Sequence, residues 1–276
     1  MGVPIAQVLS SISGLCILLG ILGQVSAEPI KPHPCGLGLV ERINPKPSIH
    51  NASKASSQVP PGSVRVTFVD HSTFQIETPQ GISAATDYAG LHIPGRVPTI
   101  VTMNNSHSSH HTDFVDPAVK HILRGWHPEA GIARHNLRVK DLRVYNLPTN
   151  IFDFGQGATN SNSIFIFEAV GLCFAHLGHL HHFLSQEQIA QVGRIDVLFV
   201  PIDGTVTLSH EEAMHIIGQI SPRVVMPMHM SFAGADKFPE IAASSHKVKY
   251  LGTNTMLINR SLLPGKTEIW FLVTEL

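Results

Sequence analysis

Histidine clusters are the most chemically informative feature of this sequence. Eight of its eighteen histidines lie in three groups. The groups are His107, His110 and His111, then His176, His179, His181 and His182, and finally His229 within the segment MPMHM. Imidazole is the commonest protein ligand for zinc and related metals, and a site needs several imidazoles that converge on one point. Because the groups lie about 70 and about 50 residues apart, only a fold can bring them together.

Each histidine group follows an apolar run that predicts a buried strand. The runs cover residues 99–103, 163–175 and 224–228. Side chains at strand ends are a common way for α/β proteins to build a site on a rigid frame. One histidine in such a place could equally cap a turn or face solvent. Three groups behind three strands instead predict a metal site.

Length and composition are those of an ordinary globular protein. The chain has 276 residues, 43% of them hydrophobic, and a formal net charge of −1. This is enough for one large domain or two small ones. Lys and Arg form no basic run, so we expect no nucleic-acid partner. The sequence contains no P-loop, nucleophile elbow or dinucleotide-binding glycine motif, so the substrate is not indicated beyond a small molecule.

The first residues have the pattern of a secretory signal peptide. An apolar stretch covers residues 5–23, and Val25, Ser26 and Ala27 supply small residues for cleavage. We therefore predict a signal peptide over residues 1–27, export to the periplasm or the extracellular space, and no membrane attachment after its removal. The segment before the apolar stretch has no Lys or Arg. The alternative is a membrane anchor formed by residues 5–23.

Two cysteines remain in the predicted mature chain, Cys35 and Cys173. Export would permit a disulfide between them, but two cysteines do not make a disulfide framework. Cys173 lies in an apolar run, where a buried thiol is the usual outcome. Whether the two cysteines pair is left open by the sequence.

The rest of the chain divides into an extended leader, residues 28–62, and a single domain, residues 63–276. The domain opens with alternating apolar residues that predict an antiparallel β-meander over residues 64–69, 73–78 and 81–87. Capping boxes predict helices that begin after Ser185 and Ser209, and Asp116 followed by Pro117 predicts another that ends at Gly125. An apolar run over residues 195–202 predicts a central strand. Mixed β-sheets covered by helices suit this order.

Five short segments in chain order resemble the metallo-β-lactamase fold superfamily. They are residues 70–74 (DHSTF), 85–87 (ATD), 105–110 (NSHSSH), 176–179 (HLGH) and 227–229 (PMH). The branch to which the chain is most similar is that of metal-dependent hydrolases like the ascorbate-phosphate lactonases. The resemblance spans roughly residues 64–232. It implies an α/β fold in which two mixed β-sheets form an αββα sandwich flanked by helices, with a metal centre at one edge.

The resemblance also shows where this chain departs from the family signature His-x-His-x-Asp-His. Asn105 takes the place of the first His, and Ser109 takes the place of the Asp. The aspartate that bridges two metals in the family is His179 here, and a further His expected within residues 149–153 is absent. The ligands that carry over are His107, His110 and His229, with His179 at the bridging position.

These departures replace carboxylates by imidazoles. A neutral imidazole is a poor bridge between two dications, so we expect about one metal ion per chain, held by His107, His110, His179 and His229 or by three of them and water. An all-imidazole set suits Zn²⁺ best, with Fe, Ni or Cu as alternatives, and disfavours Ca²⁺ and Mg²⁺. Asp87 and Asp113 are the carboxylates available to orient the ligands.

Two functions remain in competition. The first is a metal-dependent hydrolase of an ester, lactone or phosphoester that uses a metal-activated water, with His111 or Asp113 as general base in place of the missing Asp. The second is a non-catalytic metal-binding or ligand-binding descendant of the fold, in which four imidazoles close the coordination sphere. A redox role of Fe or Cu is a weaker third reading.

Overall fold

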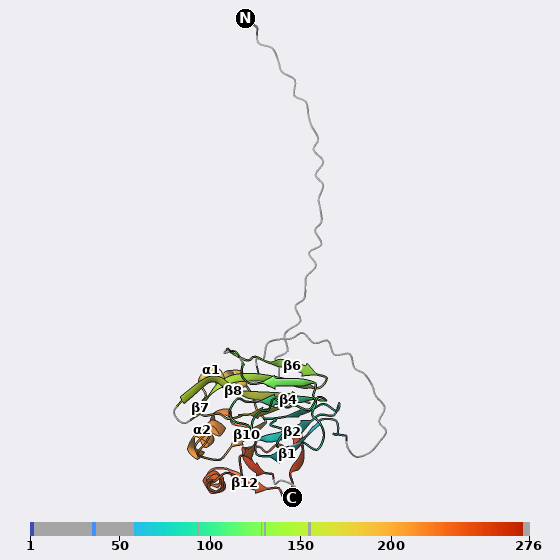
Figure 1. Cartoon of the computed structure of the whole chain (residues 1–276). Coiled ribbons are helices and arrows are strands. Elements are labelled where there is room, and N and C mark those ends of the chain that lie inside the picture. The colour runs from blue at the N-terminus through green and yellow to red at the C-terminus, as the bar shows by residue number, and fades with distance from the viewer. Residues whose placement is uncertain are drawn as a thin grey trace. The chain divides into compact units, whose positions relative to one another are not determined.

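The computed structural model describes residues 1–2, 35–36, 58–92, 94–127, 129, 131–153 and 156–272 (Figure 1). The chain divides into two units, Met1–Lys31 and Pro32–Leu276. The predicted signal peptide, except for its first two residues, and most of the predicted leader therefore lie outside the described residues. No helix of the described part is long and apolar enough to cross a membrane.

The second unit is built on two mixed β-sheets. The smaller sheet has six strands, and its first three strands along the chain form the predicted antiparallel meander. In spatial order its strands are β13 (Thr255–Asn259), β1 (Ser63–Asp70), β2 (Thr73–Glu77), β3 (Ser83–Ala85), β4 (Ile100–Met103) and β5 (His121–Arg124). Strand β4 runs parallel to both of its neighbours, β3 and β5.

The larger sheet has eight strands. In spatial order they are β12 (Lys247–Tyr250), β14 (Glu268–Phe271), β11 (Val224–Met228), β10 (Val197–Pro201), β9 (Leu172–His176), β8 (Gln156–Ala169), β7 (Leu142–Asp153) and β6 (Asn136–Val139). Strands β9, β10 and β11 are parallel neighbours whose every residue is buried. They have the near-continuous apolar sequence expected of central parallel strands.

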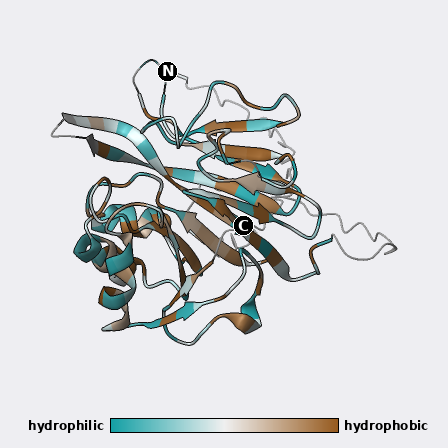
Figure 2. Ribbon diagram, turned by 60° about the horizontal axis from the view of Figure 1, so that its bottom comes forward, coloured by the Kyte–Doolittle hydropathy of each residue, from teal (hydrophilic) through white to brown (hydrophobic). Residues whose placement is uncertain are grey.

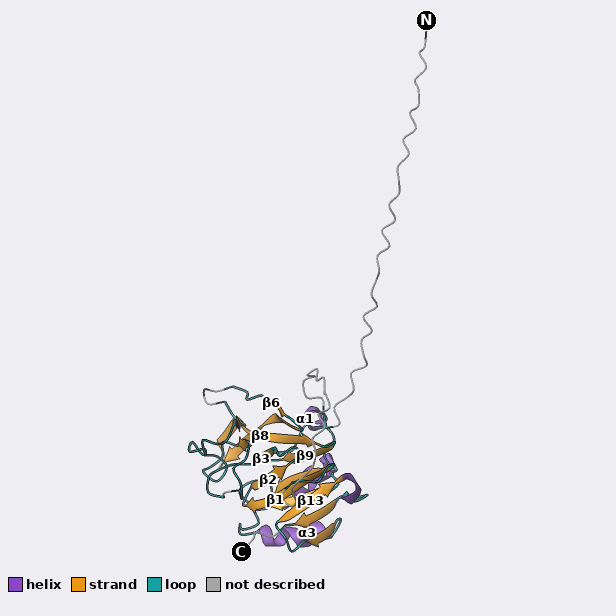
Figure 3. Cartoon of the chain, turned by 90° about the vertical axis from the view of Figure 1, so that its right-hand side faces the viewer, coloured by secondary structure: helices purple, strands orange, loops and turns teal. Residues whose placement is uncertain are grey.

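Helices cover the outer face of the larger sheet. They are α1 (Gln186–Val192), α2 (His210–Ile220) and α3 (Phe238–Ala243), with the short 3₁₀ turns η1 (Ala235–Lys237) and η2 (Arg260–Leu262). Figure 3 shows α1 near β8 and α3 at the opposite end of the strand layers. Both predicted capping boxes are present, at Ser185 with Gln188 and at Ser209 with Glu212. Each box satisfies backbone groups at the helix start that would otherwise have no partner.

Two apolar cores hold these layers together. One lies between the sheets and includes Phe74, Phe165, Phe174 and Phe199. The other lies between the larger sheet and the helices, where α2 contributes the apolar face predicted from its sequence. In Figure 2 the hydrophobic colour is concentrated on the strands, while the helices also carry hydrophilic positions. The predicted sandwich of two mixed sheets with helices is thus confirmed.

Two of the predicted elements are wrong. The helix predicted from Asp116 to Gly125 is a turn followed by the strand β5. The side chain of Asp116 accepts a hydrogen bond from the backbone of Ala118, and the residues of β5 pair with β4. The single strand predicted over residues 163–175 is a hairpin of β8 and β9. Its turn lies at Val170 and Gly171, which both have positive φ.

The cysteines form a disulfide. The sulfur atoms of Cys35 and Cys173 are bonded at 2.07 Å, and the two residues are 138 positions apart in sequence. The bond ties Cys35, which precedes β1 in the sequence, to the second residue of strand β9. It settles the question that the sequence left open.

Candidate metal centre

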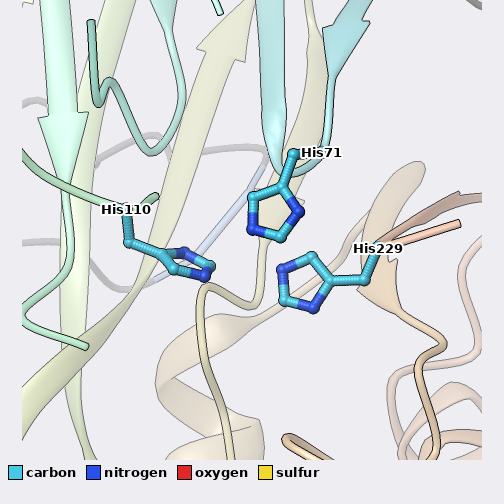
Figure 4. A group of neighbouring side chains, drawn as sticks. All are labelled: His71, His110 and His229. Carbon is cyan, nitrogen blue, oxygen red and sulfur yellow. The ribbon is translucent and has the colours of Figure 1, made fainter. Parts of the chain in front are cut away.

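Five histidines gather where strands of both sheets end. His71 lies in the turn between β1 and β2, and His107 and His110 lie in the loop after β4. His179 follows β9, and His229 follows β11. Figure 4 shows His71, His110 and His229 with their rings facing a common point from three elements. The fold therefore brings together the three sequence clusters that predicted the site.

The four predicted ligands lie close together, but their ligand atoms fall into two overlapping groups that share His110. Zinc–nitrogen bonds of about 2.0–2.1 Å in a tetrahedron place imidazole ring centres roughly 5 Å apart. The ring of His110 lies 5.3 Å from His107, 4.9 Å from His179 and 5.2 Å from His229. The ring of His179 lies 4.5 Å from His107 and 6.0 Å from His229. The ligand atoms of His107, His110 and His179 lie within 4.8 Å of one another, and His229 approaches this group through His110.

Three of these imidazoles each present a buried nitrogen that has no partner in the described part of the protein. The atoms are Nε2 of His110, Nε2 of His179 and Nε2 of His229. A buried polar atom without a partner costs free energy, so native structures seldom leave one in place without a reason. Such atoms on neighbouring rings indicate a ligand, and a metal ion is the ligand that accepts imidazole lone pairs.

The other nitrogen of each imidazole is held by a protein group. Nδ1 of His110 lies 2.6 Å from Oδ2 of Asp87, and Nδ1 of His229 lies 2.9 Å from Oδ2 of Asp203. Nδ1 of His179 lies 2.5 Å from Nε2 of His181. Metal-binding histidines are usually oriented in this way, because a bond at one nitrogen fixes the ring and leaves the lone pair of the other for the metal.

Asp203 is the anchor of His229. Burial opposes its ionisation, but hydrogen bonds from His229, from the hydroxyl of Thr207 and from the backbone outweigh it and lower its pKa below the ordinary range. Its Oδ1 accepts from the backbone amides of Thr205, Val206 and Thr207. The carboxylate therefore stays ionised and supports the imidazole that it contacts.

Asp87 is the anchor of His110. Its side chain is fully buried and also accepts a 2.9 Å hydrogen bond from Nδ2 of Asn104. Burial raises the pKa of Asp87, while the neighbouring His176 and the bond from Asn104 oppose that rise. The 2.6 Å contact with His110 holds one proton between the two side chains. Asp87 thus has the orienting role predicted for it.

His71 belongs to the cluster in a different way. It forms a group with His110 and His229 whose ring nitrogens lie within 4.8 Å of one another, as do those of His107, His110 and His179. Its ring, however, stacks on that of His229 at 4.3 Å with an angle of only 6° between the planes. Because a metal bonds in the plane of an imidazole, two parallel rings direct their lone pairs side by side. We therefore place His71 beside the ligands, not among them.

Burial keeps the imidazoles of His71, His110 and His179 neutral. It lowers the pKa of His110 well below the ordinary value, and neighbouring histidines add to the effect. The same causes lower the pKa of His179 and lower that of His71 to about 2. The neutral form is the one that binds a metal, so these residues need lose no proton near neutral pH.

The remaining histidines of the β9 loop are structural or supporting. Both ring nitrogens of His176 are bonded within the protein, to the carbonyl of Ser72 and to the amide of Gly178. His182 likewise contacts the amide of Asn150 and the carbonyl of Phe183. His176 is also fully buried, so it lies behind the candidate site and not at its surface.

Residues 65–229 match the profile of the beta-lactamase superfamily domain family. The chain belongs to this family. It is 22% identical over 174 residues to a UPF0173 metal-dependent hydrolase of Lysinibacillus sphaericus. This alignment covers 55% of this chain and 77% of that relative. It is 24% identical over 211 residues to a UPF0173 metal-dependent hydrolase of Pyrococcus furiosus, covering 68% and 92%. The resemblance seen in the sequence is thereby confirmed.

A solved structure shares the fold. A Thermotoga maritima protein of the metallo-beta-lactamase superfamily superposes with a TM-score of 0.57 and 23% sequence identity, covering 76% of this chain and 98% of that chain. This likeness supports the αββα sandwich of the family.

The positions that depart from the family signature lie at the centre itself. The hydroxyl of Ser109 lies 3.1 Å from Nε2 of His71. His179 presents one of the three buried nitrogens without a partner. The family positions are thus occupied by side chains that bring no negative charge to the metal centre.

The two residues predicted as general bases, His111 and Asp113, lie in different surroundings. The ring of His111 packs edge-on against Trp126 at 5.3 Å, and its buried Nδ1 has no partner in the described part. The side chain of Asp113 is 86% exposed, and its carboxylate lies 3.6 Å from the guanidinium of Arg124. That surface position does not support a general-base role for Asp113. The role of either residue in catalysis stays a prediction.

Sequence reasoning missed Asp203, whereas it placed His71 on the meander near the site as a structural, hydrogen-bonded residue. Asp203 follows the central strand β10 directly, with only Ile202 between them. A carboxylate at the end of a fully apolar parallel strand was the available signal, because sites of α/β proteins lie at such strand ends.

Proposed function

We propose that this protein is a metal-dependent hydrolase that acts on a small molecule with one transition-metal ion. The observation that carries the proposal is the set of three buried Nε2 atoms without partners, on rings that Asp87, Asp203 and His181 orient. Support also comes from the two relatives named metal-dependent hydrolases and from the Thermotoga maritima protein, which is described as a candidate Zn-dependent hydrolase.

Zinc is the metal that the ligand set favours. His110, His179 and His229 form the buried part of the set, and His107 is the exposed member. Imidazole ligands at tetrahedral spacing suit Zn²⁺ and would also accept Fe, Ni or Cu. No carboxylate replaces the bridging aspartate of the family, and Nε2 of His110 serves one ion only. Both points support about one ion per chain.

The roles of the residues follow from their burial. A zinc ion held here supplies Lewis-acid activation of water and of an ester, lactone or phosphoester oxygen. His110, His179 and His229 hold their rings through hydrogen bonds at Nδ1, so the buried side of the site is rigid. His107 lies on the solvent side, and we place the entry of substrate and water there.

Metal analysis of the purified protein tests the proposal first. We expect about one transition-metal ion per chain, and hydrolysis of simple esters, lactones or phosphoesters that a chelator abolishes and that added zinc restores. His229→Ala should lose both metal and hydrolysis. His246→Ala, which removes an imidazole from the surface after α3, is the matched control and should retain both. Metal-free protein that hydrolyses at the full rate would overturn the proposal.

The number of ions is tested by restoring the missing carboxylates. Ser109→Asp combined with His179→Asp recreates the two acidic positions of the family signature. Since carboxylates neutralise the repulsion between two dications, we expect metal content to rise toward two and hydrolysis of generic substrates to increase. Two ions in the unmodified protein would contradict the single-ion argument.

A non-catalytic metal protein is the second candidate, and one observation favours it. His107 completes a set of four imidazoles, which would leave no coordination position for water. His107→Ala separates the two readings. If His107 closes the site, the variant keeps its metal and gains hydrolysis. If the site is already open, His107→Ala brings no gain.

Export remains part of the proposal. The predicted signal peptide over residues 1–27 would deliver the domain to an oxidising compartment, and the disulfide between Cys35 and Cys173 suits such a compartment. The test is the first residue of the mature protein from its native host, which should be Glu28. An intact Met1 on cytosolic protein would contradict export.

A further inference from the structure

A charged cavity lies at the other end of the strands that carry the metal centre. Its volume is about 410 Å³, and its lining includes Arg194, Arg223 and Arg260 together with one acidic residue, Asp196. Asp196 directly precedes β10, and Arg223 directly precedes β11. His229 instead follows the opposite end of β11, and its partner Asp203 follows the opposite end of β10. A five-residue strand rises roughly 16 Å, so the cavity is separate from the metal centre.

Two of the guanidinium groups lie side by side. Nη2 of Arg194 and Nη2 of Arg260 both donate to the carbonyl oxygen of Gly171, at 3.0 Å and 2.5 Å. Two cations that share one neutral acceptor repel each other, since the carbonyl supplies only a partial negative charge. An anion between them would relieve this repulsion.

The charges of the lining do not balance. The carboxylate of Asp196 lies 3.3 Å from Arg194 and also accepts a 2.9 Å hydrogen bond from the backbone of Cys173. It is almost fully buried, so its charge is directed to those two partners. Asp196 is the one acidic residue of the lining, and it leaves two of the three arginines uncompensated.

Arg223 and Arg260 retain donors for a ligand. Within the described residues neither forms an ion pair. Nη1 of Arg223 donates to the carbonyl oxygen of Gly265 at 2.5 Å, and this contact holds the side chain at the cavity. A guanidinium carries five N–H donors in a planar fork that matches the oxygen atoms of phosphate and carboxylate groups.

From this arrangement we infer an anion-binding site, formed by Arg194, Arg223 and Arg260, that takes the phosphate or carboxylate group of a small molecule. Leu263 and Pro264 line the same cavity and provide an apolar wall for the organic part of such a ligand. The site does not depend on the proposed hydrolase function, because none of its residues belongs to the metal centre.

Calorimetric titration of the full chain with inorganic phosphate, and separately with malonate, tests the site. We expect one phosphate or malonate per chain in the wild type and at least tenfold weaker binding in Arg223→Gln, with no measurable binding in the Arg223→Gln, Arg260→Gln double variant. Arg134→Gln removes the same charge from an exposed arginine outside the cavity and should bind like the wild type. Tighter binding of phosphate would identify a phosphorylated ligand, and tighter binding of malonate a carboxylate.

A phosphate bound to the metal has to be distinguished from one in this cavity. His229→Ala, which should lack the metal, is expected to keep the phosphate site. Loss of phosphate binding in that variant, or unchanged binding in the double arginine variant, would overturn the inference. Crystals of the wild type soaked in phosphate need no variant. Phosphate density among Arg194, Arg223 and Arg260 supports the site, and density at the metal centre alone refutes it.

Discussion

At the scale of single residues, the carboxylates behind the ligands decide how firmly the metal is held. Asp203 accepts from His229 and, through both oxygens, from the loop that follows β10. The ionised carboxylate of Asp203 therefore orients the ring of His229 and also stabilises the loop after β10. An amide of the same shape would lose the charge and one acceptor, and the imidazole of His229 would become a weaker ligand.

We predict that Asp203→Asn weakens metal binding by about 10- to 100-fold with the fold retained, as is typical of groups that orient metal ligands. Competition with a chromogenic chelator measures the affinity. Asp236→Asn, at an exposed carboxylate in η1, is the control and should bind metal like the wild type. Equal affinity in Asp203→Asn would show that the pairing with His229 has no bearing on the metal.

The stacked pair of His71 and His229 gives a second prediction at this scale. If parallel rings cannot share an ion, His71→Asn should keep about one metal per chain, whereas His229→Ala should lose it. Asn is chosen because His71 has a φ of 52°, a left-handed conformation that Asn tolerates. Metal content by elemental analysis decides the point. Loss of the metal in His71→Asn would move the ion to the group of His71, His110 and His229.

At the scale of elements, the loop after β9 shows how backbone shape places a ligand. Gly178 has a φ of 61°, and a β-carbon on it would lie 2.3 Å from both Asn104 and Asn162. Oδ1 of Asn162 in turn accepts a hydrogen bond from the amide of His179 at 2.8 Å. The absence of a side chain at position 178 thus lets the loop turn tightly enough to direct His179 into the site.

We predict that Gly178→Ala destabilises the protein by about 2–4 kcal/mol and reduces metal content, because the left-handed conformation and the close contacts both oppose a methyl group. Chemical denaturation and elemental analysis measure the two effects. Gly218→Ala is the matched control, since Gly218 lies inside α2 with nothing within 4 Å of a β-carbon. That change should stabilise by about 0.5–1 kcal/mol. Wild-type stability in Gly178→Ala would contradict the steric argument.

Elements with local signals were predictable from the sequence, and those that depend on distant partners were not. The capping boxes at Ser185 and Ser209 act within four residues, and both helices formed as predicted. The residues after Asp116 had equally good helix signals but became β5, since pairing with β4 satisfies their backbone groups. A local sequence pattern does not show whether a distant strand will have an unpaired edge with which the segment can pair.

At the scale of the whole molecule, the candidate site was predictable as a set of ligands but not as a network. The three histidine clusters follow from residue type and from the order of the strands, and the resemblance to the family singles out His107, His110, His179 and His229 within them. The partners that orient them come from other segments, as Asp203 does for His229 at a separation of 26 residues. The stacking of His71 on His229 joins residues from different sheets and has no sequence signal.

The last prediction concerns the disulfide, because it should affect the stability of the domain without involving any predicted metal ligand. It joins Cys35 to Cys173 across 138 positions, and a link over so long a loop restricts the unfolded chain strongly. Cys173 is the second residue of β9, whereas His179 follows the far end of that strand. Removing the link should therefore lower stability and spare the ligands.

We predict that Cys35→Ser combined with Cys173→Ser lowers the free energy of unfolding by about 2–5 kcal/mol and leaves metal content near one ion per chain. Denaturant titration with and without a reducing agent measures the change. The reducing agent should destabilise the wild type and have no effect on the double variant, which serves as the control for the agent itself. Because metal binding and folding are coupled, stability has to be compared at equal free zinc. A wild type that reduction does not destabilise would show that the link stiffens only the leader and adds nothing to the sandwich.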